Sequence, residues 1–132
     1  MTKEFVVSLQ NRPGSLAEFC AGLARANVNI TGMACVPGAE FGTFRFTVTP
    51  TSAPTAEAWL RTKNIPFVTR DVLTRSVPNT PGALATICRE LFDSGVNIDS
   101  MYGFAGERPG EVELCIEPSP EHFATAKKVL GW

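Results

Sequence analysis

Two periods of apolar residues open the chain, and each predicts one kind of element. Near the start every second residue is apolar, with Phe5, Val7 and Leu9 on one side, which predicts a half-buried strand. After Pro13-Gly14 the apolar residues recur at the i, i+3, i+4 and i+7 spacing of a helix. This helical stripe consists of Leu16, Phe19, Cys20 and Leu23. The chain therefore begins with a strand, a tight turn and an amphipathic helix.

The same pattern returns 68 residues later. Segments 8–50 and 76–118 share fifteen identical residues without a gap, where average composition gives roughly two or three by chance. The block Asn11-Arg12-Pro13-Gly14-Ser15-Leu16-Ala17 aligns with Asn79-Thr80-Pro81-Gly82-Ala83-Leu84-Ala85, and Val28-Asn29-Ile30 aligns with Val96-Asn97-Ile98. The second helical stripe is Leu84, Ile87, Cys88 and Leu91. The chain is a tandem duplication.

Both copies continue with the same predicted elements. Helix ends at Asn27 and Gly95 precede second strands, and Phe44, Phe46 and Val48 alternate with polar residues in a third strand. Second helices are predicted at 54–63 and from Ser119-Pro120 onward, and copy one closes with a strand at 67–70. This βαββαβ order predicts an α+β fold of two ferredoxin-like modules, 1–70 and 71–132, each an antiparallel sheet with helices on one face. The second module lacks its own final strand.

Composition and charge narrow the class of protein. The 132 residues are 44% hydrophobic and 19% charged, which is typical of a globular chain. The formal net charge of −1 gives no general attraction to nucleic acid or anionic membranes. The start of the chain shows no signal-peptide pattern, and no apolar run approaches the ~18 residues of a membrane span. We expect a cytoplasmic protein without nucleic-acid or membrane partners.

The cysteines and the single histidine suggest neither a metal site nor catalysis. Cys20, Cys35, Cys88 and Cys115 form no CxxC pair, and His122 completes no zinc pattern with them. We interpret the cysteines as free, buried thiols and His122 as a solvated surface residue. No cofactor is predicted.

The repeated N-x-P-G-x-L at the junction of first strand and first helix has two interpretations. It is a tight turn, in which proline fixes φ and glycine permits the bend. It is also a place where a helix N-terminus with unpaired N–H groups can receive a carboxylate, with glycine allowing close approach. Asn11 and Asn79 could donate to such a ligand. The residues alone leave the two interpretations open.

The strand, the N-x-P-G-x-L that opens the helix, and the V-N-I before the second strand together resemble the ACT domain. The arrangement is similar to stand-alone tandem ACT proteins, over residues 4 to about 130. Met101-Tyr102-Gly103-Phe104-Ala105 and Phe41-Gly42 are also similar to that group. The resemblance implies a non-catalytic regulatory module that binds an amino acid.

The same resemblance implies where the amino acid binds. In such modules the ligand lies between the first strand–helix loop of one module and the second strand of its neighbour. This implies two sets of ligand-binding residues, namely Asn11, Pro13, Gly14, Ser15, Leu16, Asn29 and Ile30, and Asn79, Pro81, Gly82, Ala83, Leu84, Asn97 and Ile98. The residues alone are explained equally well if Asn29 and Asn97 are polar residues that end the helix–strand connections. Met33 and Met101 fit core positions better than ligand contacts.

Other functional classes find less support in the sequence. No G-x-S-x-G, P-loop, H-E-x-x-H or paired-carboxylate motif indicates an enzyme. The βαββαβ order also occurs in RNA-recognition modules, but Phe44 and Phe46 share the core face with Val48, and Glu111 and Glu113 on the other face would repel phosphate. The alternative to an amino-acid sensor is an ACT-like interaction module that has lost its ligand.

The absent final strand of the second module predicts association. The strand at 72–77 would lack its partner, and an open strand edge is normally paired, covered or blunted. Arg75 could blunt this edge only slightly. We therefore expect a homodimer, most simply two-fold symmetric, with ligand sites near module boundaries.

Overall fold

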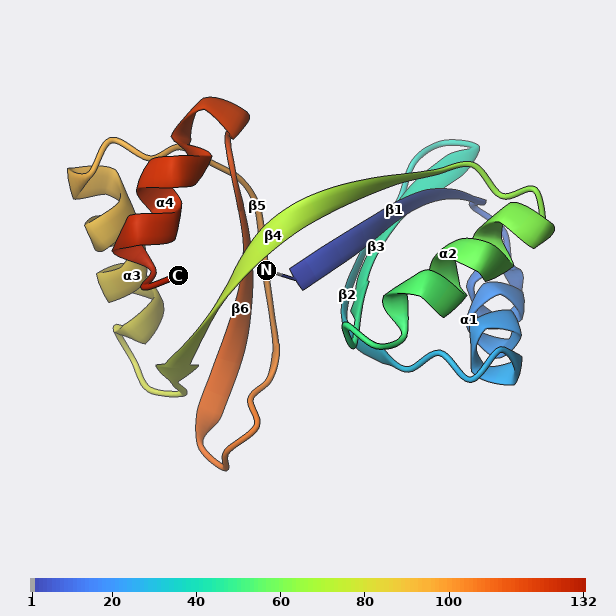
Figure 1. The fold of residues 1–132 in the computed structure, drawn as a ribbon, viewed down its shortest axis with the longest axis horizontal. Coiled ribbons are helices and arrows are strands. Elements are labelled where there is room, and N and C mark those ends of the chain that lie inside the picture. Colours follow the sequence, from blue (N-terminus) through green and yellow to red (C-terminus); the bar gives the residue numbers. More distant parts are fainter. Residues whose placement is uncertain (1) are drawn as a thin grey trace. The chain divides into compact units, whose positions relative to one another are not determined.

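The computed structural model describes residues 2–132, which divide into two compact units, residues 2–70 and 71–132. The first unit contains β1 (Thr2–Gln10), α1 (Ser15–Arg25), β2 (Ile30–Val36), β3 (Phe41–Val48), α2 (Ala53–Thr62) and the start of β4 (Phe67–Pro78) (Figure 1). The second unit contains the rest of β4, α3 (Ala83–Asp93), β5 (Ile98–Ala105), β6 (Glu111–Pro118), the 3₁₀ helix η1 (Pro120–His122) and α4 (Phe123–Val129). The predicted fold class, two tandem ferredoxin-like modules, is confirmed.

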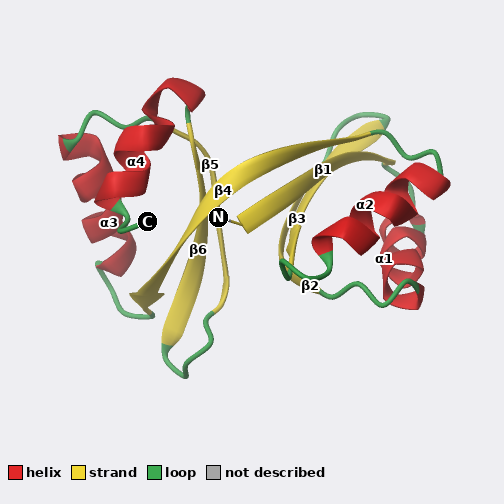
Figure 2. Ribbon diagram, viewed as in Figure 1, coloured by secondary structure: helices red, strands yellow, loops and turns green. Residues whose placement is uncertain are grey.

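The sheet of the first unit has the strand order β2-β3-β1-β4. Strands β1 and β3 pair antiparallel with Phe5 opposite Phe46 and Val7 opposite Phe44, so the apolar residues of both strands share one face. Helices α1 and α2 cover that face (Figure 2). The alternation predicted for these strands is therefore the alternation of a sheet with one buried face.

The core of the first unit is aromatic. Phe5 and Phe44 each stack on Phe46 with ring centroids 5.3 Å apart. Phe19 of α1 meets the Phe44 ring edge-on at 5.6 Å and the Trp59 ring of α2 at 5.4 Å. Such pairs stabilise beyond the area they bury, so these rings hold α1 and α2 against the sheet.

The second unit has the strand order β4-β6-β5 and an aliphatic core. Its buried side chains come from the helices, from β4 and β6 and from the residues beside them, namely Leu73, Ile87, Leu91, Val96, Leu114, Ile116, Ala126 and Leu130. The partly buried Met101 of β5 and Phe123 of α4 pack against them. The two copies thus share the order of strands and helices up to the last helix, but the first has an aromatic core and the second an aliphatic one.

Three details differ from the sequence predictions. Leu84, placed on the inward stripe, is 51% exposed, and Met33, placed in the core, is 49% exposed. The strands expected at 67–70 and 72–77 are both present, as one continuous strand β4 from Phe67 to Pro78. The last helix opens as the 3₁₀ turn η1 behind Ser119, and only residues from Phe123 onward are α-helical. The predicted helix ends are confirmed, since Asn27 and Gly95 adopt φ of 61° and 73°.

The edge of β4 in the second unit is partly covered by the residues after α4. The Trp132 indole donates a hydrogen bond to the Thr74 carbonyl at 2.8 Å, and the Arg75 guanidinium donates to the Leu130 carbonyl at 3.4 Å. The indole N–H bonds to an edge carbonyl and so takes the place of a strand partner there. Fewer backbone groups of this edge are therefore unpaired than the sequence predicts, which weakens the argument for a dimer through this edge. None of the helices formed by residues 2–132 is long and apolar enough to cross a membrane.

The contact between Gly22 and Trp59 gives a test of the packing of α1 on α2. A Cβ added at Gly22 would lie 2.3 Å from Cζ2 of Trp59. Alanine normally stabilises a helix over glycine by up to ~1 kcal/mol, but Gly22→Ala must displace the indole and is expected to destabilise by about 1–3 kcal/mol in urea denaturation. In a Trp59→Val background, which carries the residue of Val129 in copy two, the same substitution should be neutral or stabilising. Stabilisation in the parent protein would contradict this packing.

Candidate ligand site

Glycine in a left-handed conformation turns the first strand of each unit into its first helix. Gly14 and Gly82 are the N-caps of α1 and α3, both with φ of 91°, a region that other residues adopt only with strain. A Cβ at either position would meet nothing within 4 Å. The space beside this backbone is therefore open in both copies.

The first turns of both helices have N–H groups without partners. Within residues 2–132, the N–H groups of Leu16 and Ala17 donate no hydrogen bond, and neither do those of Leu84 and Ala85. No side chain caps either helix. Together with the helix dipole, such groups can receive an anion.

Asn11 fastens its loop to the turn between β2 and β3. Its N–H donates to the Glu40 carbonyl at 2.7 Å, and its side-chain amide donates to the Gly38 carbonyl at 2.7 Å. Asn79 repeats only the backbone bond, to the Gly110 carbonyl at 2.8 Å, and its side chain bonds to no other residue in the range 2–132. The Asn11 amide therefore has a structural task that the Asn79 amide lacks.

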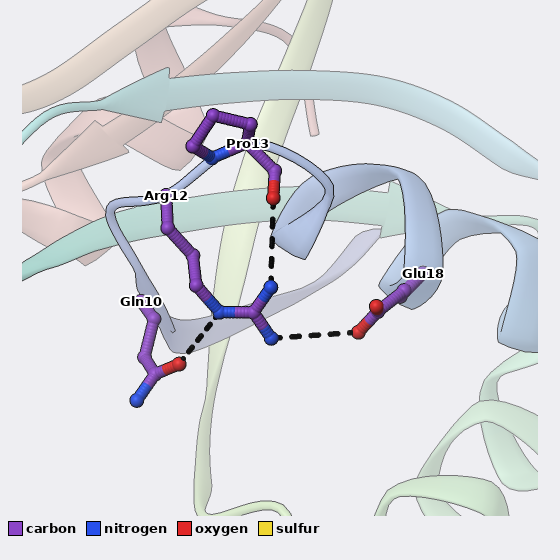
Figure 3. A network of polar contacts seen from close by, with 4 residues as sticks. All are labelled: Gln10, Arg12, Pro13 and Glu18. Carbon is purple, nitrogen blue, oxygen red and sulfur yellow. Dashed lines mark hydrogen bonds and ion pairs between the residues drawn. The ribbon is translucent and has the colours of Figure 1, made fainter.

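Arg12 extends along the first turn of α1 and joins three of its neighbours (Figure 3). Its guanidinium donates to Gln10 Oε1 at 2.9 Å and to the Pro13 carbonyl at 3.5 Å, and lies 3.7 Å from the Glu18 carboxylate. Arg12 and Glu18 are both largely exposed, so this pair presents one cation and one anion beside the open helix end.

Ser15, the first residue of α1, has a buried hydroxyl without a hydrogen-bond partner among the described residues. Leaving a buried polar group unsatisfied costs about 1–3 kcal/mol. Ser15 also lines two cavities, of about 450 and 160 Å³. The larger lies between the end of β1, α1 and the end of α2, and the smaller between the loop and the turn after β2.

The second unit has a cavity of about 410 Å³ at its own strand–helix junction. It is lined by residues of β4, of the loop after it and of α3, and Pro81, Gly82 and Ala83 are among them. Both predicted loops thus border a cavity. Leu16 lines the smaller cavity of the first unit, whereas its counterpart Leu84 is exposed.

The remaining predicted residues lie at the other end of each sheet. Gln10 pairs with Phe41, but Ile30 pairs with Val48 at the opposite end of β3, and the 11 residues of α1 span about 16 Å between these ends. In the second unit, Ile98 likewise pairs with Pro118 rather than near Pro78. Within one unit, therefore, Asn29 and Ile30 do not meet the Asn11–Leu16 loop, nor do Asn97 and Ile98 meet Asn79–Leu84.

Asn97 and His122 join two connections of the second unit. The Asn97 amide donates to Asp99 Oδ1 at 3.0 Å and to Ser119 Oγ at 2.8 Å, while its backbone N–H donates to His122 Nδ1 at 3.1 Å. Both amide hydrogens of Asn97 are thereby used within the fold. His122, predicted to be solvated, is half-buried and accepts this bond.

The thiols agree only in part with the prediction. No disulfide joins the four cysteines, but only Cys115 is buried, Cys20 and Cys88 are half-buried, and Cys35 is exposed on the edge strand β2. Burial raises the pKa of the Cys20 thiol, and the nearby Cys35 raises it further, so Cys20 is a poor nucleophile at neutral pH. Residues 2–132 contain no cluster of three or more metal-ligating side chains.

Sequence reasoning missed the residues that distinguish the two loops. Arg12 and Glu18 of copy one correspond to Thr80 and Thr86 of copy two, and Trp59 lines the 450 Å³ cavity. The signal was present in the positions where the copies differ.

The ACT domain family profile matches residues 4–58 and again residues 72–131, so the chain belongs to the ACT domain family. Protein BT0572 from Bacteroides thetaiotaomicron is similar in structure, with a TM-score of 0.86 and 31% identity over 99% of this chain and 88% of that one. The ligand-free regulatory subunit of aspartate kinase from Thermus thermophilus has a TM-score of 0.70 at 20% identity, over 98% and 89% of the two chains. A comparison with curated proteins found no match.

The two asparagines give a test of whether the Asn11 side chain holds its loop to the turn between β2 and β3. Asn11→Ala removes the bond to the Gly38 carbonyl and should lower the free energy of unfolding by about 1 kcal/mol. Asn79→Ala, the matched control, removes no such bond and should leave the urea midpoint unchanged. Equal losses in both variants would show that the Asn11 amide does not fasten the loop.

Proposed function

We propose that this ACT-domain protein is a non-catalytic regulatory protein that binds an amino acid at its strand–helix loops. The ligand carboxylate lies at the N-terminus of α1, of α3 or of both. Residues of the loops make the contact, namely Asn11, Pro13, Gly14, Ser15 and Leu16 in the first unit and Asn79, Pro81, Gly82, Ala83 and Leu84 in the second. Asn29, Ile30, Asn97 and Ile98 contribute only from a neighbouring module.

One observation carries the proposal. A Cβ placed on Gly14 or Gly82 would meet no atom within 4 Å, and within the described chain the N–H groups of Leu16, Ala17, Leu84 and Ala85 have no partner. Two adjacent unbonded N–H groups at a helix N-terminus suit the two oxygens of a carboxylate. The similarity to the regulatory subunit of aspartate kinase from Thermus thermophilus supports a regulatory role.

A second candidate function is an interaction module without a ligand. It is favoured by the Asn97 contacts, because an amide whose hydrogens are both used inside the fold is not available to a ligand. The two candidates differ in whether free amino acids bind.

Calorimetry with free amino acids tests the proposal. Isothermal titration of the full chain with each common L-amino acid at millimolar concentration should give saturable binding for at least one of them. Glycolate and ethylamine are matched controls that carry only an anion or only an amine. If no amino acid binds, the sensor proposal fails and the interaction module stands.

The proposal includes a cytoplasmic homodimer without cofactor or metal. Because Trp132 already bonds to Thr74 on the β4 edge, association through that edge must displace the indole or use strand residues beside it. Light scattering at micromolar concentration should give the mass of two chains, and Trp132→Ala should not weaken the dimer. A monomer would contradict the association.

A further inference from the structure

The 450 Å³ cavity of the first unit and the 410 Å³ cavity of the second occupy equivalent places in the two copies. Each lies between the end of a copy's first strand and its first helix, and eight lining residues of one correspond to lining residues of the other at the 68-residue shift. The equivalent lining pairs are Ser8/Ser76, Leu9/Val77, Gln10/Pro78, Arg12/Thr80, Ser15/Ala83, Glu18/Thr86, Phe19/Ile87 and Gly22/Glu90. The duplication therefore supplies an internal comparison for the chemistry of each cavity.

The first cavity has a cation and an anion, Arg12 and Glu18, at its loop end, and is also lined by Arg25 and Lys63. The charged residues that line the second cavity, Arg75 and Glu90, lie within β4 and α3 instead of at the loop. Arg12 and Glu18 lie 3.7 Å apart across the first turn of α1 (Figure 3). Thr80 and Thr86 stand in their places, and Thr86 Oγ1 bonds back to the Gly82 carbonyl. A guanidinium beside open helix N–H groups suits a carboxylate, and a carboxylate one turn further suits an ammonium group. The two groups match the two charges of an α-amino acid.

The floor of the first cavity is aromatic. Phe19 and Trp59 line it with rings 5.4 Å apart, and Phe41, which is 53% exposed, lines it as well. The indole fits because residue 22 is glycine, since a Cβ at this position would lie 2.3 Å from the Trp59 ring. Copy two has Ile87 in place of Phe19, Val129 in place of Trp59 and Glu90 in place of Gly22. No aromatic side chain is among the described residues that line its cavity.

The hydroxyl of Ser15 is the third difference. It is buried beside the two cavities of the first unit and has no hydrogen-bond partner within residues 2–132, and copy two has Ala83 there. A hydroxyl that the fold itself does not need, next to a charged pair and an aromatic floor, gains an acceptor when a carboxylate occupies the helix end.

We propose that the first cavity binds an α-amino acid with a large apolar or aromatic side chain, and that the equivalent cavity of copy two does not. Arg12 and Ser15 hold the carboxylate beside the first turn of α1, Glu18 holds the ammonium group, and the ligand side chain packs on Trp59 and Phe19, all of which line this cavity. The inference rests on the amino-acid binding proposed above and adds the site and the ligand class.

Titration of loop variants with L-phenylalanine, L-leucine, L-glutamate and glycine tests the inference. The parent protein should bind phenylalanine or leucine at least tenfold more tightly than glutamate or glycine. Arg12→Thr and Glu18→Thr, which carry the residues of copy two, should each weaken that binding at least tenfold. Thr80→Ala, the matched control in copy two, should leave it unchanged. In a Trp132→Phe background, the emission of Trp59 should change on binding.

Ser15→Ala separates a ligand contact from a structural role. The variant removes an unsatisfied hydroxyl, so we expect severalfold weaker binding together with an unchanged or higher Tm of the free protein. Weaker binding with a lower Tm would overturn the assignment of Ser15.

The outcomes distinguish the inference from the proposed function. If an amino acid binds but Arg12→Thr has no effect while Thr80→Ala weakens binding, the inference is overturned and the proposed function stands. If only glutamate or glycine binds, the ligand class is overturned. If no amino acid binds the parent protein, the proposed function fails and the inference fails with it.

Discussion

A left-handed glycine at the junction of the first strand and first helix is the constraint on which the rest of each module depends. Gly14 and Gly82 share a φ of 91°, and the asparagine three residues before each one donates its N–H to the turn between the next two strands. This pair of features fixes where the helix starts over the sheet. It also determines that two N–H groups of the helix face open space instead of a capping side chain.

The duplication preserves this backbone and changes the side chains around it. Copy one places Arg12, Glu18 and Ser15 at the junction and packs an aromatic core behind them, whereas copy two places threonines and alanine there over an aliphatic core. Since Gly14 and Gly82 give both junctions the same backbone turn, we attribute a difference in binding between the two loops to these side chains. The second copy instead uses polar residues at the other end of its sheet, where Asn97, Asp99 and Ser119 bond to one another.

Much of the fold could be predicted from the sequence because the two copies repeat the same periodicity. The strand–turn–helix order, the inward parity of Phe44 and Phe46, and the helix ends at Asn27 and Gly95 all follow from patterns local in the chain. The exposure of side chains at the edge of a sheet does not follow from local patterns, because it depends on which strand lies outermost. Met33 lies opposite Phe46 on the core face, but β2 is the outer strand of its sheet, so the side chain is half exposed.

The candidate site was predictable only where the copies agree. Identity between them pointed to the glycines and asparagines, which set the backbone of the loop. The charges of Arg12 and Glu18 occur in one copy alone, and the distance of Asn29 and Ile30 from the loop depends on strand direction in the folded sheet. Leu16 and Leu84 align in sequence, yet Leu16 borders a cavity with Cys35 and Pro37, where copy two has the smaller Gly103 and Ala105.

An amide-resolved NMR titration with L-phenylalanine and L-leucine tests the central claim most directly, because it reports on both strand–helix loops in the same sample. Recognition at the first loop predicts saturable shifts for the N–H groups of Ser15, Leu16 and Ala17, and unchanged positions for those of Ala83, Leu84 and Ala85. Shifts at neither loop, or at the second loop alone, would contradict the account.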